Sequence, residues 1–153
     1  MSDEEVLRSH RFTKGAEPEF VTHLITCGPV ERTWEAGRPI LAAGDTADRL
    51  HLIVEGDVAI GLQAPGGPPA VLQTLGPGDV LGWSWLMPPY RWAFDATAVT
   101  AVRAITLDAT RLRAAMAEDP VFGHALLARL LIAITDRLQA TRLQLLDLYG
   151  PRR

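Results

Sequence analysis

The chain has very little cysteine and lacks any hydrophobic run long enough to span a membrane. Cys27 is the single cysteine among 153 residues, so no intrachain disulfide can form, and a disulfide-stapled secreted scaffold is excluded. No stretch of about 18 uncharged apolar residues occurs, which argues against a membrane-spanning helix. The N-terminus is acidic and polar, unlike a signal peptide. We therefore expect a cytoplasmic protein without a membrane partner.

The chain also lacks an excess of positive charge. It carries 15 basic and 18 acidic residues, a formal net charge of −3, whereas nucleic-acid-binding proteins usually present a basic stripe. Hydrophobic residues make up 48% and charged residues 22% of the chain, which is enough apolar material to bury a core. The composition therefore indicates one ordinary folded domain rather than a disordered or DNA-coating protein.

Glycine and proline almost disappear from the last third of the chain. Between Tyr90 and Tyr149 only Pro120 and Gly123 occur. Because these two residue types punctuate local structure, the first part of the chain should be rich in turns and the last part helical.

Short β-type runs separated by turns follow one another from Val30. Gly56, in the run VEGDV, marks a hairpin between alternating apolar residues. About eight short strands at this spacing predict a mostly β fold, a double-stranded β-helix (jelly roll), with helices added. The predicted segments are an N-terminal helical segment at 1–29 with a short helix at 17–26, a β-roll at 30–108, and a helical segment at 109–150.

The C-terminal segment predicts a short helix followed by a long one. Asp108 is a suitable N-cap for a helix over 109–118. Pro120 can then start a long helix at its first turn and run to Tyr149, with Gly150 and the proline after it ending the helix.

The predicted long helix is apolar on two faces. Its heptad face follows a spacing of alternating four and three residues: Leu127, Leu131, Ile134, Leu138, Thr141, Leu145 and Leu148. Its second face comprises Leu126, Leu130 and Ala133. Because such a helix needs two partners, we expect the second face to pack on the β-roll and the heptad face to form a parallel homodimer. The alternative is that both faces are buried within one chain.

A series of turns occurs in step with apolar residues through the β segment. They are Trp34–Gly37–Ile40, Gly44-Asp45-Thr46-Ala47-Asp48, then Ile53, Gly56 and Val58, and Gly78-Asp79-Val80-Leu81-Gly82. This order resembles the cyclic-nucleotide-binding domain of the catabolite activator and Fnr group of regulators. The resemblance covers about residues 30–149 and implies a jelly roll followed by a long dimerisation helix. It also implies a regulatory domain that binds cAMP or cGMP, without any other cofactor.

In that family the segment after the Gly-Asp turn is a phosphate cassette. A short helix aims backbone N–H groups at the cyclic phosphate, and an arginine neutralises it. The matching segment here is 82–98, GWSWLMPPYRWAFDATA. The long helix of the family presents a hydroxyl to the purine, and Thr141 matches that position. From this resemblance we expect Gly82 and the N–H groups around Trp83 and Ser84 to bind an anion, Arg91 to neutralise it and Thr141 to close the pocket from the helix. Trp85 and Trp92 would form the aromatic walls of that pocket.

The cassette departs from the family pattern at two places. Trp83 stands where the family has a glutamate that holds the ribose hydroxyl, and an indole has no acceptor to replace a carboxylate. Arg91 is followed by Trp92 instead of serine or threonine. Counting back from Thr100 places Trp92 in the position of the family's arginine, so Arg91 serves that role only with a slip of one residue, which reverses side-chain direction on a strand.

Five aromatic residues cluster in this segment: Trp83, Trp85, Tyr90, Trp92 and Phe94. One interpretation is a hydrophobic plug that turns the cassette into core. A second is an aromatic pocket that stacks on a planar ligand with Arg91 supplying charge. A third is a docking surface for another protein. Thr141 likewise has two interpretations, ligand contact or a polar residue that sets the register of paired helices.

Enzymatic and DNA-binding functions find little support in the motifs. A cupin-type metal site needs two histidines on one strand face, and His51 stands alone, so we expect it to be a surface residue of a strand. No nucleophile elbow, P-loop or zinc-protease motif occurs, and no helix-turn-helix follows the long helix before Arg153. We expect a non-catalytic sensor that signals through its C-terminal helix to an unidentified protein partner. The alternative is a degenerate fold that docks proteins through the Trp/Tyr cluster.

Overall fold

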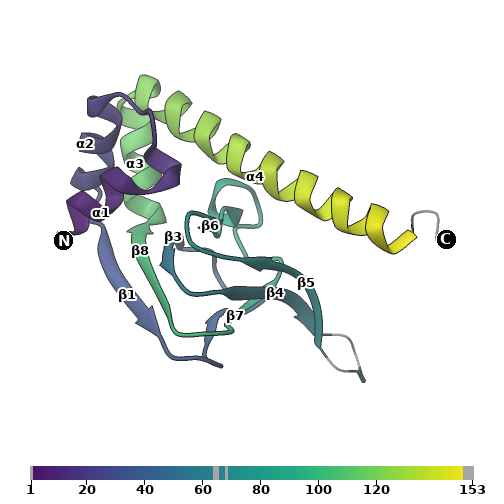
Figure 1. The fold of residues 1–153 in the computed structure, drawn as a ribbon. Helices are drawn as coiled ribbons and strands as arrows, with labels where there is room; N and C mark the ends of the chain where they lie inside the picture. The colour runs from purple at the N-terminus through teal and green to yellow at the C-terminus, as the bar shows by residue number, and fades with distance from the viewer. Residues whose placement is uncertain (1, 64–65, 68, 150–153) are drawn as a thin grey trace.

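The computed structural model describes residues 2–63, 66–67 and 69–149. Three helical elements come first, then eight strands with one short helical turn between the sixth and the seventh, then two helices (Figure 1). In order they are α1 (Asp3–Ser9), η1 (Arg11–Thr13), α2 (Pro18–Thr26), β1 (Val30–Trp34), β2 (Pro39–Leu41), β3 (Arg49–Glu55), β4 (Val58–Gln63), β5 (Pro69–Leu75), β6 (Val80–Leu81), η2 (Ser84–Leu86), β7 (Asp95–Ala98), β8 (Val102–Asp108), α3 (Ala109–Glu118) and α4 (Pro120–Tyr149).

The strands form two four-stranded antiparallel sheets, which confirms the predicted jelly roll. One sheet has the order β1-β8-β3-β6 and the other the order β2-β7-β4-β5. A small apolar core lies inside the roll and takes residues from both sheets: Ile53, Val58, Leu75, Leu81, Ala96, Ala98 and Val102. Gly56 turns β3 into β4 with a φ of +89°, as the hairpin motif predicted.

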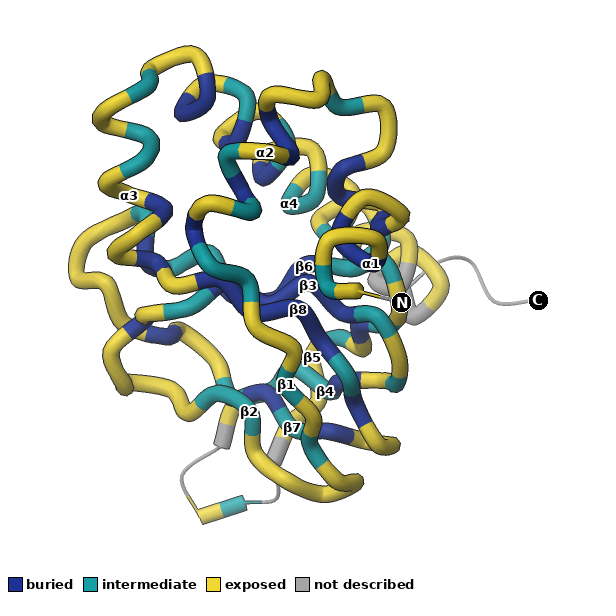
Figure 2. Tube along the Cα trace, turned by 90° about the vertical axis from the view of Figure 1, so that its left-hand side faces the viewer, coloured by how far each residue is buried: buried dark blue, intermediate teal, exposed yellow. Residues whose placement is uncertain are grey.

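A larger core lies between the helices and the β1-β8-β3-β6 sheet. Leu50 and Leu52 of β3 and Ile105 and Leu107 of β8 belong to it. The helices contribute Leu7, Leu24, Leu112, Leu126 and Leu130. Side chains alternate between the two faces of a strand, so β3 and β8 are buried on both sides, as the dark traces in Figure 2 show. The N-terminal and C-terminal helical segments therefore share one core with the roll.

His51 is buried, and the expectation that it lies on the surface was wrong. Only 2% of the residue is exposed, its Nδ1 atom lies 2.8 Å from the Thr106 hydroxyl, and its ring meets Trp34 edge-on at 5.4 Å. The error came from treating β3 as a strand with one solvent-facing side. Burial, together with the smaller effect of the positive charges of Arg49 and Arg32, lowers the pKa of His51 to about 3.

The long helix α4 packs through one face and exposes the other. Leu126 and Leu130 are buried against the body, as predicted for the second face. On the heptad face Leu127, Leu131 and Leu138 are exposed, Leu131 by 63%. The alternative in which both faces are buried within one chain is therefore wrong. The side chains of Leu145 and Leu148, and the expected helix stop from residue 150 onward, lie outside the described residues.

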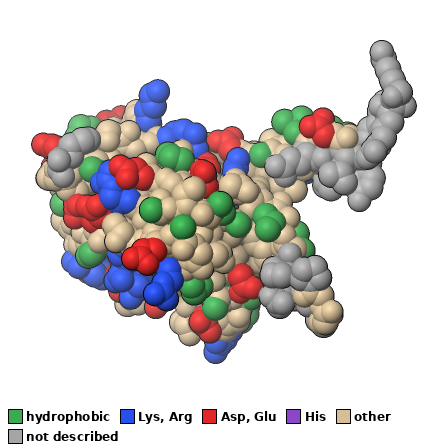
Figure 3. All heavy atoms as spheres, turned by 60° about the horizontal axis from the view of Figure 1, so that its bottom comes forward, with side chains coloured by type: hydrophobic (Ala, Val, Ile, Leu, Met, Phe, Trp, Pro, Cys, Tyr) green, Lys and Arg blue, Asp and Glu red, His purple; other side chains and the backbone are tan. Residues whose placement is uncertain are grey.

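The surface of the molecule mixes charged and hydrophobic side chains. On the face shown in Figure 3, basic and acidic side chains are interspersed with hydrophobic ones. No helix among the described residues is long and apolar enough to cross a membrane.

Candidate functional site

The cassette segment begins with a packed turn. η2 (Ser84–Leu86) is the short helix that follows β6, as in the family pattern. Trp85 is fully buried in the core beneath it, and its indole Nε1 donates to the carbonyl oxygen of Gly82 at 3.0 Å. Trp83 and Ser84 are half-buried. The structure thus places the Trp85 indole in the core, hydrogen-bonded to the turn that was expected to cradle an anion.

Gly82 is in direct contact with Trp92. The glycine has a φ of +91°, and a Cβ atom built on it would lie 2.8 Å from the Trp92 ring and 3.1 Å from the Arg49 carbonyl oxygen. Trp92 is itself buried. A glycine is required here both by the backbone conformation and by the close approach of the indole.

Arg91 points away from its neighbour Trp92. Residues 90–92 form backbone hydrogen bonds with the β2–β3 turn, among them Trp92 N–H to the Asp45 carbonyl at 2.9 Å and Gly44 N–H to the Trp92 carbonyl at 2.9 Å. In such an extended segment successive side chains alternate in direction, so Trp92 is buried and Arg91 exposed. The guanidinium donates from Nη1 to the Gly44 carbonyl at 2.9 Å.

A second arginine, which the sequence analysis did not single out, holds the cassette to α3. Arg113 donates from Nη1 to the Trp85 carbonyl at 2.8 Å, and its guanidinium carbon lies 5.7 Å from the centre of the Tyr90 ring. A cation over an aromatic ring is an attractive arrangement. The cassette is therefore attached to the helical layer at both Trp85 and Tyr90.

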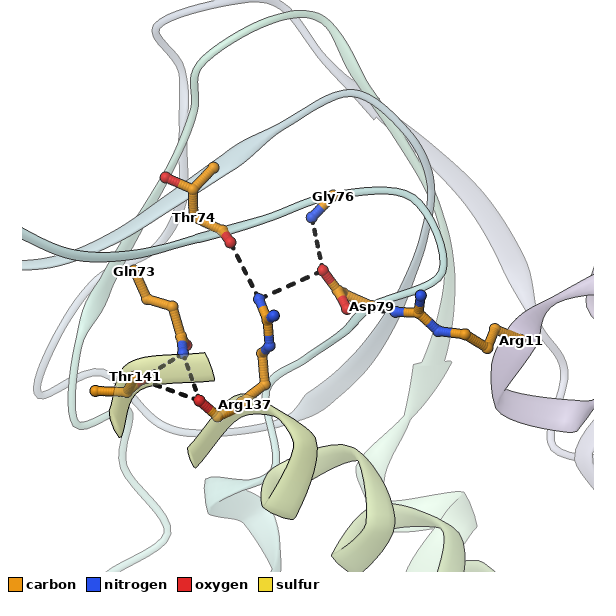
Figure 4. A network of polar contacts seen from close by, with 7 residues as sticks. All are labelled: Arg11, Gln73, Thr74, Gly76, Asp79, Arg137 and Thr141. Carbon is orange, nitrogen blue, oxygen red and sulfur yellow. Dashed lines mark hydrogen bonds and ion pairs between the residues drawn. The ribbon is translucent and has the colours of Figure 1, made fainter. Parts of the chain in front are cut away.

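Thr141 faces the β-roll of its own chain. Its hydroxyl accepts a hydrogen bond from the Gln73 side-chain amide at 2.8 Å and donates to the Arg137 carbonyl at 3.0 Å (Figure 4). The same Gln73 amide also donates to the Arg137 carbonyl at 3.0 Å. The C-terminal half of α4 is thus hydrogen-bonded to β5.

Asp79 connects three parts of the chain in the same region. Its Oδ2 accepts from the Gly76 N–H at 2.8 Å and lies 3.6 Å from Arg137 Nη1, while its Oδ1 accepts from Arg11 (Figure 4). Arg137 also donates to the Thr74 carbonyl at 3.1 Å. One carboxylate therefore ties the N-terminal segment, the β5–β6 turn and α4 together, three residues before Gly82.

Sequence reasoning missed Gln73 and Arg137, although one signal was present. Arg137 lies four residues before Thr141, on the same side of the helix, and Asp79 belongs to the Gly-Asp motif.

A cleft of about 490 Å³ adjoins this network and is lined by Arg11, Phe12, Gly78, Asp79, Arg129 and Arg137, among others. Within the part of the chain that the structure describes, no group of three or more His, Cys, Asp or Glu side chains is placed to hold a metal ion.

Comparisons with known proteins agree with this architecture. The model of the cyclic nucleotide-binding domain matches residues 31–119, more than half of the chain. The chain belongs to the cyclic nucleotide-binding domain family. It is 32% identical over 146 residues to a CRP-like cAMP-activated global transcriptional regulator of Mycobacterium tuberculosis, covering 95% of this chain and 62% of that protein. The chain thus spans a little under two thirds of the length of this curated relative.

Solved structures show the same fold. The N-terminal domain of a transcriptional regulator from Streptomyces coelicolor superimposes with a TM-score of 0.67 at 28% identity, covering 89% of this chain and 94% of that one. The catabolite activator protein of Thermus thermophilus gives a TM-score of 0.67 at 28% identity, covering 90% of this chain and 63% of that one. The family resemblance derived from the turns is therefore confirmed.

The ligand-binding roles of the seven cassette and helix residues stay predictions. The structure brings Gly82, Trp85 and Trp92 together, but it places Arg91 at the β2–β3 turn and Thr141 at β5. Burial of Trp85 and Trp92 agrees with the interpretation of the segment as a hydrophobic plug. A docking surface in this segment would rely on the side chains that remain exposed, Met87, Tyr90 and Phe94.

Proposed function

We propose that this domain is a non-catalytic regulatory module that binds a cyclic nucleotide, cAMP or cGMP, and signals through α4. The observation that carries the proposal is the set of contacts from Thr141 and Arg137 to Gln73, Thr74 and Asp79. They connect the helix to the strand and turn that lead directly into Gly82. A ligand that occupies the cassette and engages Thr141 would have to compete with Gln73 for the hydroxyl.

The signal would be a change in how α4 packs. A ligand shifts a conformational equilibrium only by its difference in affinity for the two states. The contacts of Gln73 and Asp79 hold α4 against the roll in this state, so binding that replaces them favours another position of the helix. The exposed heptad face of α4 would carry that change to a second copy in a parallel homodimer, and from there to a partner protein. Cytoplasmic location and the absence of direct DNA contact remain part of this proposal.

Calorimetric titration with cAMP and with cGMP tests the proposal. The wild-type protein should bind at least one nucleotide, and Arg91→Ala should weaken binding by about 2 kcal/mol, roughly 30-fold, because a charge-assisted phosphate contact is lost. Arg38→Ala is the matched control, since Arg38 is an exposed arginine outside the cassette. Its affinity should equal that of wild type.

One result would contradict the proposal as a whole, and a second would contradict the role of Arg91. Absence of heat and of NMR shifts with both nucleotides would remove the sensor function and leave the docking module. Equal affinity of Arg91→Ala and wild type would show that Arg91 stays at Gly44 and that another group neutralises the phosphate.

A further inference from the structure

A second cleft, of about 520 Å³, lies between β1, β2, β3 and residues 91–92. Its polar and aromatic lining includes Arg32, Trp34, Arg49, His51, Arg91 and Trp92. Among the described residues none from α4 lines it, and Thr141 and Gly82 to Trp85 take no part. Arg91 and Trp92 belong to both this cleft and the predicted cassette, whereas the other lining residues come from β1, β2, β3 and the β2–β3 turn.

Three arginines from separate segments line this cleft. Arg32 comes from β1, Arg49 from β3 and Arg91 from the segment before β7. Arg32 and Arg49 are half-buried, and neither forms an ion pair with any residue that the structure describes. Partial removal of a guanidinium group from water costs free energy unless a hydrogen bond or an opposite charge compensates for it.

One nitrogen of Arg32 is left without any acceptor. Its Nε atom is buried and has no hydrogen-bond partner among the described residues. A buried donor without an acceptor has lost its hydrogen bonds to water and gained none in the protein, which lowers the stability of the fold. An acceptor that entered the cleft beside Arg32 would remove that cost.

The acidic residues of the cleft do not cancel its positive charge. Asp45 and Asp48 line it from the β2–β3 turn, where both are exposed to solvent. Three arginines against two aspartates leave one net positive charge. Arg49 and Arg32 both act on His51, as the direction of their effect on its pKa shows, so the positive potential reaches the buried histidine.

We propose that this cleft binds a multiply charged phosphate group of a small metabolite, held by Arg32, Arg49 and Arg91. Guanidinium groups match the geometry of phosphate oxygens and donate in pairs. A phosphate dianion offers enough oxygens to accept from three arginines at once and to satisfy the unpaired nitrogen of Arg32. Trp34, which meets His51 edge-on, supplies an aromatic wall for the rest of the molecule.

NMR titration of the wild-type protein with inorganic pyrophosphate tests the proposal. The indole N–H signal of Trp34 should shift in a saturable way, at constant ionic strength kept with sodium chloride. Arg32→Gln and Arg49→Gln should each weaken pyrophosphate binding by about tenfold or more. Arg38→Gln is the control, because this exposed arginine lies outside the cleft, and it should leave the affinity unchanged.

The wild-type titration alone can overturn the proposal, so the test does not depend on the folding of the variants. If the Trp34 signal does not shift, or shifts equally with chloride, the cleft is not a phosphate site. Thr141→Val should bind pyrophosphate as wild type does, whether or not the protein binds cyclic nucleotides. Because Arg91 is also assigned to the cyclic phosphate in the proposed function, competition between the two ligands is measured in Arg91→Ala. Displacement of pyrophosphate by cAMP that persists in this variant would show a single shared site and contradict the inference.

Discussion

At the residue scale, the contact between Gly82 and Trp92 determines how much of the Gly82 backbone a ligand can reach. The resemblance predicted a glycine whose backbone approaches a ligand, whereas the structure shows that glycine covered by an indole from its own chain. The position that matches the family's arginine is thus occupied by an apolar ring, and the arginine beside it faces the opposite way. The sequence showed that Arg91 lies one residue before the position of the family's arginine. It did not show which of the two side chains, Arg91 or Trp92, faces the core.

Gly82→Ala should destabilise the domain by about 2 kcal/mol, because the new methyl group adds both backbone strain and a clash with the Trp92 ring. Urea unfolding followed by tryptophan fluorescence measures the change. Gly37→Ala is the matched control, since Gly37 has a φ of +86° but no atom within 4 Å of the added Cβ. If both variants lose the same stability, the contact with Trp92 contributes nothing.

His51 should make the stability of the domain depend on pH. Its pKa is about 3 in the folded state, well below the ordinary 6.5, so the unfolded state binds a proton first as the pH falls. The contribution of neutral His51 to the free energy of unfolding is therefore complete above about pH 6.5. It decreases toward pH 3 by as much as about 1.4 kcal/mol per pH unit. His51→Phe, which keeps a ring against Trp34, should flatten this slope.

Urea unfolding between pH 7 and pH 5 measures the effect of His51. His124→Gln serves as the control, because His124 is exposed on α4. Buried His10, whose pKa is also lowered by burial, remains in both variants and adds a slope of the same sign. A slope in His51→Phe as steep as in wild type would refute the assignment.

At the element scale, most helices and strands followed from local signals. Asp108 caps α3 as expected, with its side chain accepting from the Arg111 N–H at 3.0 Å, and Pro120 starts α4. The helix α1 lies in the segment 1–29 that was predicted to be helical, but only the helix at 17–26 was located there. The capping box of Ser2 and Glu5, which marks the start of α1, was not used. Contacts across elements, such as Gln73 with Thr141, have no local signal and could not be predicted from spacing.

Thr141→Val should loosen the C-terminal half of α4 from β5. The substitution removes the acceptor for the Gln73 amide at nearly constant volume, and a hydrogen bond of this kind contributes about 1 kcal/mol. Hydrogen exchange of backbone amides in residues 133–143 should become faster, while exchange in α3 stays the same. Gln139→Ala, at an exposed position of the same helix, should not change the exchange rates. Unchanged exchange in Thr141→Val would mean that the contact does not hold the helix.

At the scale of the whole molecule, the jelly roll was predictable because its turns occur in a fixed order along the chain. The double burial of β3, and with it the location of His51, depends on helices that come from both ends of the sequence. The same holds for the two clefts, whose walls join segments far apart in the chain. Predictions based on neighbouring residues therefore succeeded for elements and failed for places where several elements meet.

The exposed heptad face of α4 should make the protein a dimer. Leu131→Asp would place a charge in the centre of the proposed interface and should give a monomer in sedimentation equilibrium, with wild type at twice that mass. Gln139→Glu, exposed and off the heptad face, should stay dimeric. A monomeric wild-type protein at high concentration would exclude pairing through this face.

The two oxygens of Asp79 are shared by cations from opposite ends of the chain, Arg11 near the start and Arg137 in the last helix. Removing Arg11 would leave Oδ1 of Asp79 without its cation and allow Arg137 to bind both carboxylate oxygens. The first residues of the chain would in this way influence how strongly its last helix is held to the β5–β6 turn, through one shared carboxylate.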